Sequence, residues 1–129
     1  MVKKASTAIS DAEDVAIIKE PRRFTLEELA QRAEPALKAC GAERAIAFGS
    51  WARGTADAYS DLDLAVVLDT GLPARKRGSR LLALSEALPV AVDLLVYTPA
   101  EFTRGIEEKS GVFDAIAREG VTLYARSAR

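Results

Sequence analysis

Two segments of this sequence alternate with the period of a β-strand, and each places aspartate on one of its two faces. The apolar faces consist of Leu62, Leu64, Val66 and Leu68 in the first segment and of Val90, Val92, Leu94 and Val96 in the second. The opposite faces carry Asp61 and Asp63 in the first segment and Asp93 in the second. Because aspartate is rare in strands and an unpaired buried charge is costly, these three carboxylates need a partner.

The other predicted elements alternate between helix and strand. Thr25 and Glu28 have the spacing of a capping box and begin a helix that we expect to end at Gly41, and Thr98-Pro99 begins another. Further helices are expected over residues 81–88 and 112–118, and further strands over residues 45–48 and 121–124. With no internal repeat or linker, this order predicts one α/β domain over residues 21–129, preceded by a partly ordered N-terminal arm, residues 1–20.

Composition excludes several kinds of site. The chain of 129 residues has no histidine and one cysteine, Cys40, so it cannot form a histidine-dependent nucleophile, a histidine zinc site or an internal disulfide. Its net charge of −1 gives no general attraction for nucleic acid or for an anionic membrane, and we expect neither to be bound directly. Acidic residues at positions 11, 13 and 14 interrupt the apolar stretch that a signal peptide requires, and no apolar run is long enough to span a membrane. We therefore expect a cytoplasmic protein.

The three aspartates favour a divalent cation. Asp61 and Asp63 are two positions apart and project from one strand face, and Asp93 joins them if the two strands are neighbours. Such a cluster raises its own proton affinity unless cations neutralise it, and oxygen ligands without histidine or thiolate suit Mg²⁺, with Mn²⁺ as the second choice. Two such ions about 3.5 to 4 Å apart can hold phosphates and polarise an attacking hydroxyl. The alternative is a solvated sheet face on which Asp61 only caps its strand.

A glycine and a serine stand at the end of the strand that is predicted before these segments. Gly49 lets a phosphate approach the backbone, and Ser50 offers a hydroxyl and begins a helical turn whose amides favour anions. A Gly-Ser pair alone is most often a plain turn, but Gly49-Ser50 followed after ten residues by Asp61-x-Asp63 is a far more specific pattern. It indicates a phosphate-binding turn beside the carboxylates.

These motifs resemble those of a known family. Residues 48–54, Phe-Gly-Ser-Trp-Ala-Arg-Gly, and residues 60–64, Ser-Asp-Leu-Asp-Leu, resemble the signature of minimal nucleotidyltransferases of the DNA polymerase β superfamily. Residues 92–96, Val-Asp-Leu-Leu-Val, look like the strand that carries the third carboxylate of that family. The likeness spans about residues 25–124 and implies a mixed sheet flanked by helices.

The resemblance also implies roles for single residues. Asp61 and Asp63 would bind the metal ions, and Asp93 would complete the metal site and help to deprotonate the acceptor hydroxyl. Gly49 and Ser50 would hold the triphosphate of the nucleotide. Arg53 would steer a phosphate, the alternative being a charge on a surface loop.

The activity that the resemblance implies involves a partner protein. Many small members of this superfamily are antitoxins paired with a HEPN-domain ribonuclease, which some of them modify by adding AMP to a tyrosine. We expect a Mg²⁺-dependent enzyme that transfers AMP from ATP to a hydroxyl of such a partner. A non-catalytic antitoxin that only binds the ribonuclease stays open, as does transfer to a small molecule or an RNA end. The chain has no room for the substrate domain of larger relatives, so a partner or a second subunit of a homo-oligomer would present the acceptor.

For some other residues a structural role is expected, and a functional role is the alternative. Trp51 is expected to pack in the adjoining core, and stacking on a base is the alternative. A group of cations is expected at a solvated helix start, and a surface for RNA, nucleotide or an acidic partner is the alternative. This group comprises Arg75, Lys76, Arg77 and Arg80.

Overall fold

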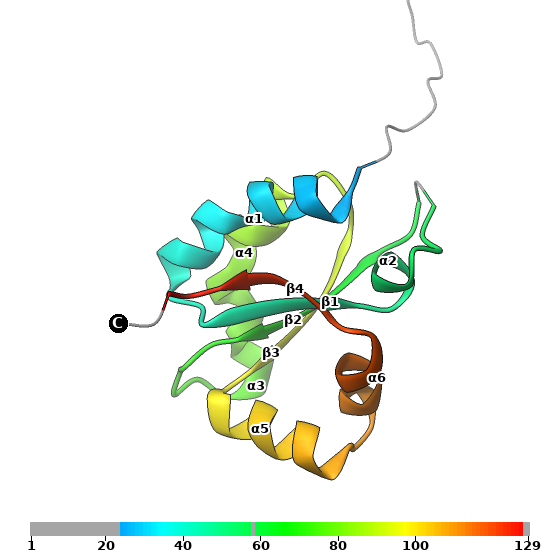
Figure 1. The fold of residues 1–129 in the computed structure, drawn as a ribbon. Coiled ribbons are helices and arrows are strands. Elements are labelled where there is room, and N and C mark those ends of the chain that lie inside the picture. The colour runs from blue at the N-terminus through cyan, green and yellow to red at the C-terminus, as the bar shows by residue number, and fades with distance from the viewer. Residues whose placement is uncertain (1–23, 58, 128–129) are drawn as a thin grey trace, which may run out of the picture.

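The computed structural model describes residues 24–57 and 59–127, which form a four-stranded sheet with helices on both faces (Figure 1). In chain order the elements are α1 (Leu26–Cys40), β1 (Arg44–Phe48), α2 (Ser50–Arg53), β2 (Leu62–Val67), α3 (Ala74–Arg77), the 3₁₀ helix η2 (Gly78–Leu81), α4 (Leu82–Ala87), β3 (Val92–Tyr97), α5 (Pro99–Glu108), α6 (Val112–Glu119) and β4 (Val121–Ala125). The predicted α/β class is confirmed. The predicted arm, residues 1–20, lies outside the described residues. Among the described helices, none has the length and apolar character needed to cross a bilayer.

The sheet is mixed and has the strand order β3-β2-β1-β4. Strand β1 runs antiparallel to both β2 and β4, whereas β2 and β3 are parallel. A parallel pair requires a crossover, which α3, η2 and α4 supply. In the register of this pair, Asp63 lies directly beside Asp93. The parallel pairing therefore brings together two aspartates that are far apart in the sequence.

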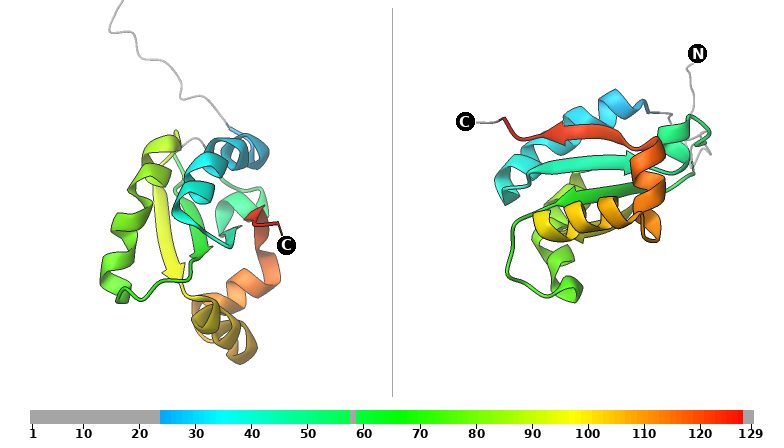
Figure 2. Two further views of the ribbon diagram at one scale, coloured as in Figure 1. Left: turned by 90° about the vertical axis from the view of Figure 1, so that its left-hand side faces the viewer. Right: turned by 60° about the horizontal axis from the view of Figure 1, so that its bottom comes forward.

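Two hydrophobic clusters cover the two faces of the sheet, with α1 and α4 over one face and α5 and α6 over the other (Figure 2). The first cluster includes Leu29, Leu37, Leu62, Leu64, Val66 and Leu84, and the second includes Ile46, Ala65, Val67, Phe102 and Ile116. The apolar face predicted from the alternation in residues 61–68 is thus confirmed as core. Asp63 lies on the opposite face, beyond Ala65 and Val67, at the end of β2 from which the chain enters the strand.

Helix boundaries follow local signals closely except in the crossover. Thr25 and Thr98 both cap their helices through reciprocal capping boxes, and Gly41 ends α1 in the left-handed conformation, as predicted. The helix expected over residues 81–88 is observed as α4, but two short elements, α3 and η2, precede it in the crossover. Gly78 and Ser79 are weaker helix formers than their neighbours, which favours a tighter 3₁₀ turn at this point.

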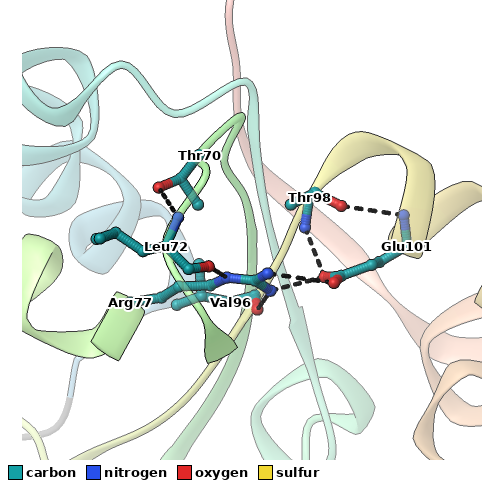
Figure 3. Close-up of polar contacts among 6 residues, drawn as sticks. All are labelled: Thr70, Leu72, Arg77, Val96, Thr98 and Glu101. Atoms are coloured by element: carbon teal, nitrogen blue, oxygen red, sulfur yellow. Dashed lines mark hydrogen bonds and ion pairs between the residues drawn. The ribbon is translucent and has the colours of Figure 1, made fainter. Parts of the chain in front are cut away.

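Arg77 is a buried cation that joins three segments (Figure 3). Its Nε donates to the Leu72 carbonyl at 2.8 Å, and Nη1 donates to the Val96 carbonyl at 3.2 Å. The guanidinium also pairs with Glu101, whose Oε1 accepts from Nη1 at 2.6 Å and from the Thr98 backbone N–H at 2.9 Å. The hydrogen bond from Arg77, with that from Thr98, holds the pKa of Glu101 below its usual value. Arg77 thus links the crossover, β3 and the first turn of α5.

The expectation of a solvated cation group is therefore wrong for one of its members. Arg75, Lys76 and Arg80 are exposed, but the Arg77 side chain is only 8% exposed. The charge pattern alone cannot distinguish Arg77 from the three exposed cations, because the carbonyls and the carboxylate that accept from Arg77 come from other segments.

Arg77→Ala is expected to lower the free energy of unfolding by about 2 to 3 kcal/mol, because it removes the side-chain donor of two carbonyls and the ion-pair partner of Glu101. Urea denaturation followed by circular dichroism measures this loss. Arg75→Ala, an exposed cation on the same helix, is the matched control, with an expected change within about 0.5 kcal/mol. Equal effects of the two substitutions would contradict the role assigned to Arg77.

Candidate active site

The turn between β1 and α2 depends on glycine at position 49. Gly49 has φ 74° and ψ −151°, a conformation that is almost confined to glycine. A Cβ built on Gly49 would collide with Oδ2 of Asp63. The predicted reason for this glycine was approach of a phosphate, and the structure adds a second reason, which is close packing of the turn on the Asp63 carboxylate.

Asp63 is the central carboxylate of the predicted trio. It lies between Phe48 on β1 and Asp93 on β3, and it is half-buried, whereas Asp61 and Asp93 are exposed. Burial raises the pKa of Asp63, and the charges of Asp93 and then Asp61 raise it further, while Arg53 lowers it. A hydrogen bond between the Asp63 and Asp93 side chains also raises this pKa. The site therefore disfavours the charged form of Asp63, and a bound cation would stabilise that form.

Two hydrogen bonds stabilise the loop that connects α2 to β2. The Ser50 carbonyl accepts from the Thr55 backbone N–H at 3.0 Å, and Trp51 Nε1 donates to the Ser60 carbonyl at 3.1 Å. The Trp51 ring packs against the first core cluster, as expected. Trp51 thus fixes the residue that immediately precedes Asp61.

Sequence reasoning missed Glu119, the last residue of α6. Its Oε2 accepts from the Gly49 backbone N–H at 2.9 Å and from Arg53 Nη1 at 3.0 Å. Glu119 is separated from Arg53 by 66 positions and has no motif around it, so no local signal could have linked it to the turn.

Comparison with models of known protein families identifies the family of this chain. Residues 25–117 match the family model of the nucleotidyltransferase domain. The chain belongs to the nucleotidyltransferase domain family. The predicted resemblance is confirmed, and the mixed sheet flanked by helices is the nucleotidyltransferase fold. A search of curated proteins found no match.

Solved structures of similar fold include two toxin–antitoxin structures. A toxin–antitoxin solved with AMP-PNP is 21% identical, with a TM-score of 0.53 over 75% of this chain and 73% of the other. A mutant of the toxin–antitoxin MntA-HpeT is 19% identical, with a TM-score of 0.52 over the same shares of the two chains. A candidate nucleotidyltransferase from Sulfolobus solfataricus is 18% identical, with a TM-score of 0.51 over 78% of this chain and 84% of the other.

The carboxylates of this nucleotidyltransferase domain fit magnesium in their chemistry. Within residues 24–57 and 59–127, no group of three or more His, Cys, Asp or Glu side chains is arranged to hold a metal ion. Mg²⁺, however, is usually bound through one or two carboxylates, several waters and the phosphates of a substrate rather than by a cage of side chains. Asp63 and Asp93 supply such a pair, and the metal roles of Asp61, Asp63 and Asp93 stay a prediction.

Proposed function

We propose that this nucleotidyltransferase transfers AMP from ATP to a hydroxyl group of a partner protein, and that it is the antitoxin of a toxin–antitoxin pair whose toxin is a HEPN-domain ribonuclease. The observation that carries the proposal is the contact of the Gly49 turn with Asp63, which itself lies beside Asp93. Groups that can donate hydrogen bonds to a phosphate and carboxylates that can bind cations then lie at the same end of the sheet.

The chemistry assigned to the residues follows from their positions. In the transfer, the acceptor oxygen forms a bond to the α-phosphorus of ATP, the bond to the β-phosphate oxygen breaks, and pyrophosphate leaves. Ser50 and Arg53 would hold the triphosphate beside Asp63, and the exposed Asp93 would accept the proton of the attacking hydroxyl. Mg²⁺, bound by Asp61, Asp63 and Asp93, would neutralise phosphate charge and polarise that hydroxyl.

A protein acceptor is supported by the openness of the site. Asp61 and Asp93 are exposed, so a group presented by another macromolecule can approach them. Two of the solved structures of similar fold are toxin–antitoxins, one of them solved with AMP-PNP. These similarities support both the partner and the adenine nucleotide.

The proposal is tested by incubating the purified protein with α-labelled ATP, Mg²⁺ and a candidate HEPN-domain partner. We expect label on that partner with the wild-type chain and none with Asp61→Asn plus Asp63→Asn, because the neutral amides cannot replace the carboxylates as cation ligands. An unlabelled partner with the wild-type chain would contradict the transfer. A double variant that inhibits the ribonuclease as fully as the wild type would show inhibition by binding alone.

A further inference from the structure

One carboxylate oxygen joins the β1–α2 turn to the end of α6. Glu119 Oε2 accepts both the Gly49 backbone N–H and Arg53 Nη1. The Glu119 side chain is 18% exposed and that of Arg53 is 51% exposed. Glu119 is therefore the better-packed partner, and Arg53 is the side chain whose direction the contact determines.

We infer that Glu119 is a positioning residue, which fixes the backbone of Gly49 and orients Arg53 toward the phosphate groups of a nucleoside triphosphate. This inference rests on the proposed function. A guanidinium has five N–H donors, and the contact with Glu119 uses Nη1, so Nε and Nη2 are left for phosphate oxygens. The planar fork of arginine suits such a division between a carboxylate and a phosphate.

The direction of the expected effect follows from the ordering of the Arg53 side chain. An exposed arginine loses up to about 2 kcal/mol of rotamer entropy when it becomes ordered, and a guanidinium that is already held avoids part of that loss on binding. Charge acts in the opposite direction, because removal of Glu119 takes a negative charge from beside Arg53, but the Arg53 side chain is 51% exposed and solvent screens this effect. Removal of Glu119 should therefore weaken binding. If Glu119 instead competed with phosphate for Arg53, its removal would strengthen binding.

The test measures binding of AMP-PNP in the presence of Mg²⁺ by isothermal titration calorimetry, with no acceptor present. Glu119→Ala is expected to bind about tenfold more weakly than the wild type, which is about 1.4 kcal/mol. Glu119→Gln keeps an oxygen acceptor for Gly49 and should recover part of the affinity. In the transfer assay, KM for ATP should rise while kcat changes little. The matched control is Asp114→Ala, which removes an exposed ion pair to Arg118 on the same helix and should leave affinity unchanged.

A double-mutant cycle separates positioning from a structural role. In an Arg53→Ala background, Glu119→Ala should weaken binding less than it does in the wild-type background, because only the contact of Glu119 with the Gly49 backbone is then left to lose. Additive effects, tighter binding, or a lower melting temperature with unchanged affinity would each overturn the inference. If Glu119→Ala does not fold, Glu119→Gln is measured in its place. Wild-type affinity for AMP-PNP together with an unchanged KM for ATP in that variant would overturn the inference as well. Failure of the wild-type chain both to bind AMP-PNP and to transfer AMP would overturn the proposed function itself.

Discussion

Asp63→Asn is expected to reduce nucleotidyl transfer by about 10²- to 10³-fold, because it removes one charge from the centre of the site where charge must be stabilised in the transition state. Asn has nearly the same shape as Asp, so the packing of Asp63 against the Gly49 turn is retained. The measurement is kcat/KM with α-labelled ATP and the partner protein. The loss then reports the carboxylate charge and not a rearranged turn.

The same substitution is expected to change the dependence of stability on pH. The folded chain holds the pKa of Asp63 above its usual value of 3.8, chiefly through burial and then through the charges of Asp93 and Asp61. Between pH 3.8 and the raised pKa, the folded protein binds more protons than the unfolded chain. The free energy of unfolding therefore decreases as the pH rises through this range. Asp63→Asn lacks this decrease. Urea denaturation across this pH range, without divalent cations, measures the difference.

Asp69→Asn is the control for the transfer measurement. Asp69 is an exposed carboxylate that follows the same strand at its other end, and its replacement should leave transfer unchanged. Full activity of Asp63→Asn would contradict the assignment of Asp63 to the cation site. A steeper loss of stability with rising pH in that variant would contradict the raised pKa.

The sequence predicts those parts of this fold and site that depend on local spacing. Alternation in residues 61–68 and 90–97 indicated both strands and the faces of their aspartates, because a period of two is a property of the strand itself. That β2 and β3 are neighbours in parallel register was a condition of the carboxylate cluster and could not be read from either strand. Only the resemblance to nucleotidyltransferases supported it in advance.

Contacts between distant segments account for what was missed. Arg77 and its exposed neighbours share one charge pattern, and only the folded positions of Leu72, Val96 and Glu101 distinguish it. Glu119 likewise enters the site because α6 packs near β1 and ends beside the Gly49 turn. Neither contact has a sequence signature, since each partner looks ordinary where it stands in the chain.

Gly49→Ala is expected to lower the free energy of unfolding by about 2 to 6 kcal/mol, from two separate causes. Its φ of 74° and ψ of −151° cost a residue with a side chain about 1 to 3 kcal/mol, and overpacking of the new methyl group on Asp63 adds about 1 to 3 kcal/mol. Transfer should fall by about 10²-fold where the chain still folds, because a displacement of Asp63 of about 1 Å misplaces the reacting groups. Urea denaturation and the transfer assay measure the two effects.

Gly54→Ala is the matched control. Gly54, at the other end of α2, also has a positive φ, 79°, but within the described part of the chain no heavy atom other than those of its neighbours in sequence lies within 4 Å of the position of its Cβ. It should show only left-handed backbone strain, about 1 to 2 kcal/mol, and keep most of the activity. In an Asp63→Ala background the carboxylate that Gly49→Ala strikes is gone, so the cost of Gly49→Ala should shrink to its backbone strain. An undiminished cost in that background would show that the conformation of Gly49, and not its contact with Asp63, requires glycine there.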